Sequence, residues 1–179
     1  MTSPSGTGRL PRGRTPGSTY RIAVVCLGNI CRSPIAEVVL TDKLARAGLD
    51  GHVEVVSAGT GPWHVGEPMD RRAAALLTAH GYDATAHRGQ QFDATWFAEC
   101  DLILAMDTSN HADITDQLEG ADEGRVRMFR DFDPRAGDGD RDVPDPYFGG
   151  DEGFETVLAM VDRTAAAVVE MLERELNGG

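Results

Sequence analysis

The sequence predicts an α/β domain in which a parallel sheet is covered by helices on both faces. Two observations support this fold class. Short apolar, β-branched runs alternate along the chain with stretches of helical pattern, as expected when parallel strands are joined through helices. The length of 179 residues suits one domain with a single substantial core, and no internal repeat or linker divides it.

Four strands and four helices are expected in alternation. The expected strands are Tyr20 to Cys26, Val53 to Ser57, Asp101 to Met106 and Arg125 to Phe129. The expected helices are Pro34 to Ala47, Asp70 to His80, Ser109 to Leu118 and a last one from about Glu152 onward. Ser33 is a suitable N-cap for the first helix, and Gly48 is placed to close it.

The last helix is expected to face the core with one apolar stripe. A long acidic loop, from Arg130 to about Gly150, precedes it. The apolar positions recur at spacings of three and four: Phe154, Val157, Leu158, Val161, Ala165, Val168, Leu172 and Leu176. Packing against the sheet is a sufficient explanation for this stripe.

The composition argues against several classes of partner. Acidic side chains outnumber basic ones by 29 to 17, which gives a formal net charge of −12. An acidic protein repels nucleic acid and anionic membranes, so neither is expected as a partner. No apolar run approaches the roughly 20 residues that span a bilayer. The sequence leaves the oligomeric state open, with a monomer as the simplest expectation.

The cysteines and the N-terminal segment indicate a compartment. Cys26, Cys31 and Cys100 match neither a secreted disulfide framework nor a zinc site. They favour a reducing environment, so we expect a cytoplasmic protein. The first 18 residues are rich in Gly, Pro, Ser, Thr and Arg and lack the apolar core of a signal peptide. We expect residues 1–18 to be a disordered tail, with a basic targeting role as the alternative, and residues 19–179 to be the folded domain.

The turn between the first expected strand and the first expected helix suits an anion. Such turns lie at the carboxyl edge of a parallel sheet, where ligands bind beside helix N-termini. Backbone N–H groups pointing into one concavity, with a helix dipole of about half a positive charge, favour a phosphate. Gly28 and Asn29 best tolerate the left-handed angles that a sharp turn needs. The expected phosphate-binding loop comprises Leu27, Gly28, Asn29, Ile30, Cys31 and Ser33.

Cys26 and Arg32 lie at the two ends of this loop and suit nucleophilic attack on a phosphate ester. The positive field of the loop favours the thiolate, which is the nucleophilic form. The planar guanidinium of Arg32 can grip two phosphate oxygens. The Ser33 hydroxyl could stabilise a departing thiolate as well as cap the helix. For Cys26 taken alone, the better interpretation is a buried cysteine at the end of a strand. The whole segment from Cys26 to Pro34 favours a catalytic cysteine instead.

A phosphate ester with a poor leaving group also needs a proton donor, and the acidic loop offers two Asp-Pro pairs. Asp145 is followed by Tyr147 and Phe148, which could form the walls of a slot for an aromatic substrate. Asp133 is followed, after its proline, by Arg, Ala and Gly, which offer no such wall. We therefore expect Asp145 to be the general acid, although most Asp-Pro pairs only start turns.

Four strings match one known enzyme family in its order, over nearly the whole chain beyond residue 19. They are VCLGNICRSPIAE (Val25 to Glu37), SAGT (Ser57 to Thr60), DLILAMD (Asp101 to Asp107) and DPYFGG (Asp145 to Gly150). The chain thereby resembles the low-molecular-weight protein tyrosine phosphatases. The resemblance implies a twisted, four-stranded parallel sheet and hydrolysis of phosphotyrosine in a protein partner. It implies Cys26 as nucleophile, Arg32 as phosphate ligand and Asp145 as general acid and base, with no metal and no cofactor.

The resemblance also assigns supporting residues. Asn29, Ser57 and His87 look like the network that fixes the loop in this family, with turn, strand-end and exposed-loop roles as the plain alternatives. The residues that resemble the walls of the substrate slot are Trp63, Tyr147 and Phe148, with packing as the alternative for Trp63. In some relatives a second cysteine protects the nucleophile through a reversible disulfide, which makes Cys26–Cys31 a hypothesis here.

Three other activities stay open. Arsenate reductases of this fold need a relay of further cysteines downstream of the nucleophile, and beyond the phosphate-binding loop only Cys100, which we expect to be inert, lies there. Protein-arginine phosphatases commonly carry Thr in the place of Ile30, so the larger apolar side chain favours tyrosine. A non-catalytic phosphotyrosine-binding module would keep Arg32 but would need neither a nucleophile nor an acid.

Overall fold

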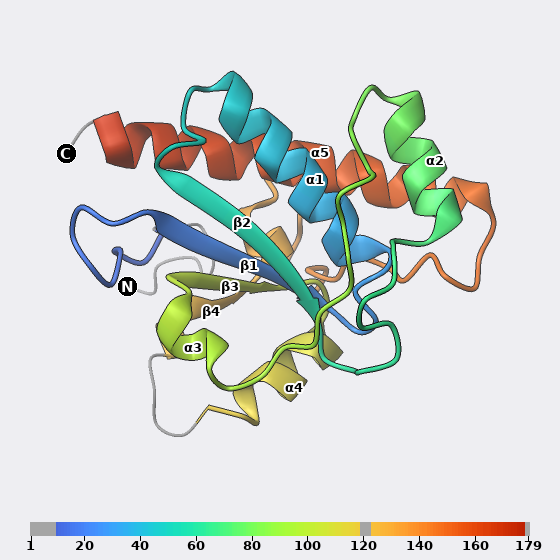
Figure 1. The fold of residues 1–179 in the computed structure, drawn as a ribbon, viewed down its shortest axis with the longest axis horizontal. Coiled ribbons are helices and arrows are strands. Elements are labelled where there is room, and N and C mark those ends of the chain that lie inside the picture. The colour runs from blue at the N-terminus through green and yellow to red at the C-terminus, as the bar shows by residue number, and fades with distance from the viewer. Residues whose placement is uncertain (1–9, 119–122, 178–179) are drawn as a thin grey trace.

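Four parallel strands form one twisted sheet, as the sequence predicts (Figure 1). The structure is a computed structural model that describes residues 10–118 and 123–177. The strands are β1 (Tyr20–Cys26), β2 (Val53–Gly59), β3 (Leu102–Ala105) and β4 (Val126–Met128), in the order β2-β1-β3-β4. The register pairs Cys26 with Gly59 and Val25 with Ala105. The loops that follow β1, β2 and β3 therefore start side by side at one edge of the sheet.

Helices cover both faces of this sheet (Figure 1). One layer contains α1 (Arg32–Arg46), α2 (Arg71–Ala79) and α5 (Asp151–Asn177), and the other contains α3 (Trp96–Glu99) and α4 (Thr108–Thr115). Two 3₁₀ turns, η1 (Glu123–Arg125) and η2 (Phe129–Phe132), flank β4. In β1, Ile22 and Val24 join the core under α1 and α5, while Ala23 and Val25 join the core on the other face. This alternation explains why the central strand is apolar throughout.

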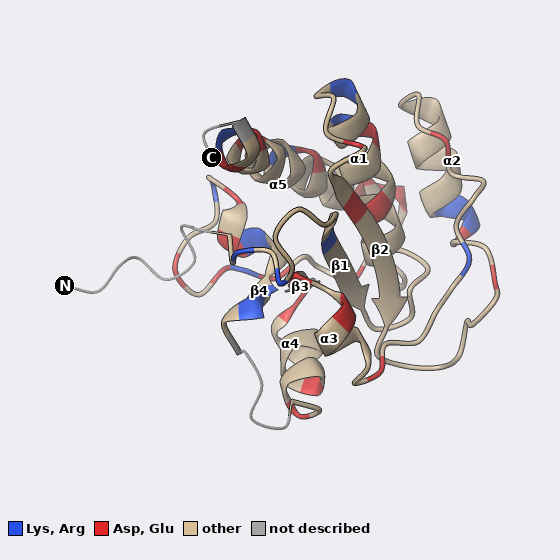
Figure 2. Cartoon of the chain, turned by 60° about the vertical axis from the view of Figure 1, so that its left-hand side comes forward, with Lys and Arg blue, Asp and Glu red and all other residues tan. Residues whose placement is uncertain are grey.

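Charged residues occur in both helical layers (Figure 2). Acidic side chains are spread over helices on either side of the sheet, while basic ones gather in fewer places, among them the start of α2 (Figure 2). Among the residues that the structure describes, no helix combines the length and the apolar character needed to cross a membrane.

The first helix starts earlier than expected. α1 begins at Arg32, and Cys31 occupies the N-cap position without a side-chain cap hydrogen bond. The predicted N-cap role of Ser33 is therefore wrong. Its hydroxyl lies 3.0 Å from the Cys26 sulfur and accepts a hydrogen bond from Asn29 Nδ2 at 2.8 Å. Residue 33 is already inside the helix, so its hydroxyl does not cap the helix and contacts Cys26 and Asn29 of the loop instead.

Two further expectations differ from the structure. Leu176 is 43% exposed, whereas the other positions of the predicted stripe on α5 are buried. The last turn of the helix extends past the core, whose final member on α5 is Leu172. The short helix α3 was not expected, because four residues are too few to show a helical period. Its Trp96 and Phe97 pack against the core on the α4 side of the sheet.

The segment from residue 10 to residue 18 contacts the domain near the amino ends of the strands. The Arg14 amide donates to Asp101 Oδ1 at 2.7 Å, and the Tyr20 hydroxyl donates to the Pro11 carbonyl at 2.8 Å. Asp101 also accepts from the Arg21 amide at 2.7 Å, so one carboxylate joins this segment to β1. The structure thus departs from the predicted disordered tail in these residues, and residues 1–9 lie outside the described part of the chain.

A buried ion-pair network ties the acidic loop to α5. Asp133 is 5% exposed and accepts hydrogen bonds from the Arg163 guanidinium at 2.7 and 2.9 Å and from Arg130 Nε at 2.9 Å. Arg130 also donates to the carbonyl of Asp142 at 2.9 Å. Burial alone would raise the pKa of the Asp133 carboxyl, but the hydrogen bonds from Arg163, the Arg135 amide and Arg130 lower it well below its usual range. This carboxylate therefore stays ionised and anchors the loop.

Asp133→Asn should lower the free energy of unfolding at pH 7 by roughly 3 kcal/mol, because it removes the buried carboxylate that pairs with Arg130 and leaves that arginine only its ion pair with the exposed Asp140. The pKa of Asp133 is lower in the folded chain than in the unfolded chain, where it is about 3.9. Its contribution is therefore complete above that value, and the difference between variant and wild type should shrink as the pH falls below about 4. Urea denaturation at pH 7 and pH 3 measures both effects. The matched control is Asp138→Asn, because the Asp138 side chain is fully exposed and lies 3.7 Å from Arg141; this change should leave the midpoint nearly unchanged. Equal losses in the two variants would contradict the network.

Candidate active site

The loop between β1 and α1 closes around the Cys26 sulfur. Cys26 ends β1 and is 3% exposed. Asn29 has a φ of 58°, the left-handed conformation that turns the chain back, and its backbone N–H donates to Cys26 Sγ at 3.3 Å. The Ser33 hydroxyl, in the first turn of α1, lies 3.0 Å from the same sulfur. The sulfur therefore lies at a helix N-terminus, where N–H groups and the helix dipole favour an anion.

The carboxamide of Asn29 holds the loop in shape. Its Nδ2 donates to Ser33 Oγ at 2.8 Å and to Ser57 Oγ at 3.0 Å, and its Oδ1 accepts from the Gln90 amide at 2.9 Å. Asn29 is completely buried. Both of its N–H groups and its oxygen have partners, so the loop is fixed by the protein itself.

His87 supports the loop from a third segment of the chain. Its Nε2 lies 2.8 Å from the Asn29 carbonyl oxygen, and its Nδ1 lies 3.3 Å from Glu37 Oε1. The Ser57 hydroxyl donates to the same Glu37 oxygen at 2.6 Å. Both ring nitrogens face oxygen atoms, so the ring can donate a hydrogen bond to either one. The structure thus brings Asn29, Ser57 and His87 together, and Glu37 joins them.

Arg32 is 3% exposed and is oriented by two neighbours. Its Nη1 donates to Asp107 Oδ2 at 2.6 Å and to the Val143 carbonyl at 3.0 Å, while its Nη2 lies 3.7 Å from Asp145 Oδ2. Burial alone would lower the pKa of the guanidinium, but the negative charges of Cys26, Asp107 and Asp145 raise it overall. The positive charge of Arg32 is therefore secure despite its burial.

Of the two Asp-Pro pairs, only Asp145 lies at this site. Residues 145–150, the last part of the acidic loop, are called the acid loop below. They place the Asp145 side chain at the cavity that Cys26 also lines. The Asp145 side chain is 38% exposed and accepts from the Tyr147 N–H at 3.1 Å. Asp133 is committed to its ion pairs with arginines, and its depressed pKa makes it a poor proton donor.

The cavity above Cys26 is narrow and has an aromatic rim. Its volume is about 180 Å³. All three expected wall residues line it, and their exposed fractions are 64% for Trp63, 42% for Tyr147 and 90% for Phe148. The rings of Tyr147 and Phe148 pack edge to face with centroids 4.9 Å apart. The other lining residues are Leu27, Gly28, Ile30, Cys31, Arg32, His64 and Asp145. Such a slot suits a flat aromatic ring that carries a phosphate at its inner end.

The other two cysteines are poorly suited to nucleophilic attack. Burial raises the pKa of the Cys31 thiol to about 12 and that of the Cys100 thiol to about 11. Both are free thiols, as is Cys26. Cys31 lines the same cavity as Cys26, whereas Cys100 lies in the core on the α4 side of the sheet.

A cysteine thiol, a fixed cation and a carboxyl group thus border one small cavity, an arrangement that suits transfer of a phosphoryl group to sulfur. The family model described as low molecular weight phosphotyrosine protein phosphatase matches residues 21–177. The chain belongs to this family. The resemblance drawn from the four sequence strings is confirmed.

Relatives of known sequence and structure agree with this family membership. The chain is 43% identical over 162 residues to the low molecular weight protein-tyrosine-phosphatase of Streptomyces coelicolor. The alignment covers 89% of this chain and 98% of that protein. A protein tyrosine phosphatase structure from Entamoeba histolytica matches with a TM-score of 0.82 and 29% identity, over 88% of this chain and 99% of that one. A Drosophila arginine phosphatase structure matches with a TM-score of 0.77 and 28% identity, over 85% and 97% of the two chains.

Several contributors to this phosphatase site were not singled out from the sequence. Glu37 and Asp107 are the last residues of two of the matching strings, so the sequence did contain a signal for them. His64 lines the cavity with its Nδ1 2.7 Å from Glu67 Oε2, and nothing in a single sequence marks it. Val143 contributes a carbonyl oxygen, which any residue could supply.

Gly59→Ala should disable the site without unfolding the protein. A Cβ at this position would lie 2.7 Å from the Leu27 carbonyl oxygen and 3.1 Å from the Asn29 nitrogen, which are backbone atoms of the loop. Displacement of the loop by a fraction of an ångström to an ångström should lower kcat/KM for an aryl phosphate by about tenfold to a hundredfold. The matched control is Gly51→Ala, where an added Cβ meets nothing within 4 Å. Circular dichroism checks folding, and wild-type activity in Gly59→Ala would refute the close-packing argument.

Proposed function

We propose that this chain is a protein-tyrosine phosphatase that works through a phosphocysteine formed on Cys26. One observation carries the proposal. Cys26 at the end of β1, Arg32 in the first turn of α1 and Asp145 in the acid loop all border one cavity, although Asp145 is far from the other two in the sequence. Membership of the phosphatase family supports the same assignment.

In the first step the Cys26 thiolate attacks phosphorus, and the S–P bond forms as the P–O bond to tyrosine breaks. Asp145, protonated, gives its proton to the departing phenolate oxygen. Arg32 and the loop N–H groups bind the remaining phosphate oxygens, whose charge they stabilise in the transition state. The fixed position of Arg32 between Asp107 and the Val143 carbonyl supports this role, because its orientation requires no reorganisation.

In the second step water hydrolyses the phosphocysteine. Asp145, now ionised, removes a proton from the water as its oxygen attacks phosphorus, and the S–P bond breaks to release phosphate and the thiolate. The Ser33 hydroxyl lies 3.0 Å from Cys26 Sγ and is placed to donate a hydrogen bond to this leaving thiolate. The remaining loop residues, held by Asn29, Ser57 and His87, keep the same geometry through both steps.

The depth and the walls of the cavity support phosphotyrosine as the substrate group. Cys26 is 3% exposed, while the rim residues Trp63 and Phe148 are mostly exposed. A phosphate on an aromatic ring reaches deeper than one on serine or threonine, and the ring can pack between aromatic walls. The partner is thus a phosphotyrosine protein. Because the nucleophile must remain a free thiol, we place the enzyme in the reducing cytoplasm.

Phosphoarginine is the second candidate substrate, since the arginine phosphatase of Drosophila has a similar fold. The apolar side chain of Ile30 lines the cavity and favours an aromatic ring over a polar guanidine group. The same assay can therefore compare both phosphorylated residues.

The intact chain should release phosphate from a phosphotyrosine peptide in the presence of a chelator, and Cys26→Ser should release none. A phosphoarginine peptide of matched sequence serves as the competitor substrate. Turnover of phosphotyrosine by the intact chain alone supports the proposal. Preferential turnover of phosphoarginine would replace it with the second candidate. Binding without turnover in either variant would indicate a phosphotyrosine-binding module.

Asp145→Asn should lower kcat/KM for tyrosine phosphate by about a hundredfold, because general acid catalysis contributes at least this much when the leaving group is poor. The loss for 2,4-dinitrophenyl phosphate should be much smaller, because that leaving group departs without a proton. Asp151→Asn, an exposed acid just past the acid loop, is the matched control and should change neither value. Equal losses for the two substrates would mean that another residue is the acid.

A further inference from the structure

Arg72, in the first turn of α2, reaches across to the acid loop. Its Nη2 donates to the Tyr147 carbonyl at 2.9 Å, and its Nη1 donates to the Gly149 carbonyl at 3.2 Å. These two carbonyls belong to one compact turn, in which the Gly149 amide donates to the Pro146 carbonyl at 3.1 Å. The Tyr147 amide in turn donates to Asp145 Oδ1 at 3.1 Å. A side chain that holds this turn therefore also holds the carboxyl group.

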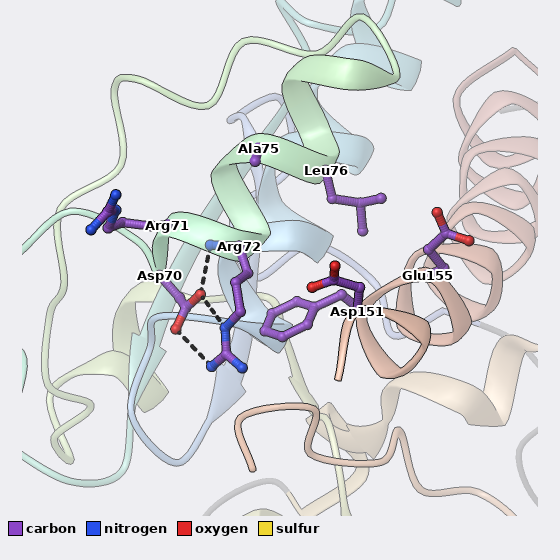
Figure 3. A pocket seen from close by; sticks show the side chains of 8 residues that line it. Asp70, Arg71, Arg72, Ala75, Leu76, Asp151 and Glu155 are labelled. Carbon is purple, nitrogen blue, oxygen red and sulfur yellow. Dashed lines mark hydrogen bonds and ion pairs between the residues drawn. The ribbon is translucent and has the colours of Figure 1, made fainter. Parts of the chain in front are cut away.

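Asp70 fixes Arg72 from the other side. Its carboxylate accepts from Arg72 Nε and Nη2, each at 3.2 Å, and from the Arg72 backbone amide at 2.8 Å as the N-cap of α2 (Figure 3). The Asp70 amide donates to the Ile30 carbonyl in the phosphate-binding loop at 2.9 Å. Burial alone would raise the pKa of the Asp70 carboxyl, but the hydrogen bonds from Arg72 lower it, so the pair is charged at neutral pH. A continuous set of contacts thus runs from the phosphate-binding loop to the acid loop.

The guanidinium of Arg72 also lies over two aromatic rings, 4.6 Å from the ring centre of Phe154 and 5.6 Å from that of Tyr147. Beside it is a cavity of about 710 Å³ between the first two turns of α2 and the start of α5, where Asp151 and Glu155 lie across from Leu76 (Figure 3). Because the cavity leaves one side of the guanidinium open, close packing on all sides does not fix its position. Its hydrogen bonds and ring contacts therefore set its position.

We propose that Arg72 is a positioning residue that holds the acid loop so that Asp145 faces the leaving oxygen of the substrate. This inference rests on the proposed function, because it concerns the acid of that reaction. Asp145 itself has few constraints: its side chain is 38% exposed and lies 3.7 Å from the Arg32 guanidinium. Arg72 supplies the constraint from outside the loop, and Asp70 sets its distance from the phosphate-binding loop.

The test is the dependence of kcat/KM on the leaving group, measured with a series of aryl phosphates whose phenols differ in pKa. In Arg72→Gln, kcat/KM for phenyl phosphate should fall by about tenfold or more, as expected for a misplaced catalytic group. The value for 2,4-dinitrophenyl phosphate should stay close to wild type, so the plot against leaving-group pKa should become steeper. Arg72→Lys keeps the charge but lacks the fork that reaches both carbonyls and Asp70, so it should lie between the two.

Arg71→Gln is the matched control, since Arg71 is exposed on the same turn of α2 and points away from Arg72 (Figure 3). It should keep the wild-type slope. Asp70→Asn, which preserves the capping capacity, should steepen the slope less than Arg72→Gln does. Thermal denaturation of each variant reports any loss of folded protein, which would lower kcat/KM for all substrates equally and leave the slope unchanged.

A steeper slope confined to the Arg72 and Asp70 variants supports the positioning role. An unchanged slope in Arg72→Gln, whether kcat/KM falls uniformly or not at all, overturns it. The failure of the proposed function is a different outcome, because it would appear as absent turnover, or turnover independent of Cys26, in the wild-type chain itself.

Discussion

The carboxamide of Asn29 is the group on which the rest of the site depends. The backbone at this residue adopts the left-handed conformation that wraps the loop around the Cys26 sulfur. The side chain then binds α1 through Ser33, β2 through Ser57 and a more distant segment through the Gln90 amide. Electrostatic stabilisation of a transition state requires donors that are already in place, and these bonds keep the loop N–H groups in place.

The site also shows how an acidic protein can bind an anion. The chain carries a net charge of −12, yet Arg32 presents a buried positive charge beside the Cys26 sulfur. Asp107 orients the guanidinium, because its Oδ2 accepts a hydrogen bond from Arg32 Nη1 at 2.6 Å. Charges on the surface are screened over about 8 Å at physiological salt, so the local arrangement outweighs the net charge.

Two identical Asp-Pro pairs place their carboxyl groups in contrasting surroundings. Asp133 is 5% exposed and surrounded by arginines, so it stays ionised and secures the acidic loop against α5. The Asp145 side chain is 38% exposed and lies 3.7 Å from the Arg32 guanidinium, surroundings that agree with the acid–base role that we propose for it. Stability needs a carboxylate that never changes charge, whereas acid–base catalysis needs one that does. Arg163 donates to the Asp133 carboxylate itself, whereas Arg72 donates to a backbone carbonyl of the acid loop.

The sequence by itself determined the sheet and the phosphate-binding loop, and it supplied the residues that we propose for the chemistry, since each follows from a local pattern. The apolar run of β1 and the string from Cys26 to Pro34 identify a buried strand and an anion-binding turn without knowledge of any distant contact. Local pattern also misled where context mattered, as for Ser33, whose hydroxyl serves the Cys26 sulfur instead of the helix end.

Only the tertiary structure decided which distant groups complete the site. Asn29 donates a hydrogen bond to Ser57, 28 positions further along the chain, and Arg32 donates one to the Val143 carbonyl, 111 positions further along. No short segment of sequence specifies either contact. Such contacts arise when the parallel register brings the strand ends together and α5 packs across α1. A single sequence specifies what each residue can do chemically. Packing of the whole chain specifies which of those groups come within hydrogen-bond distance.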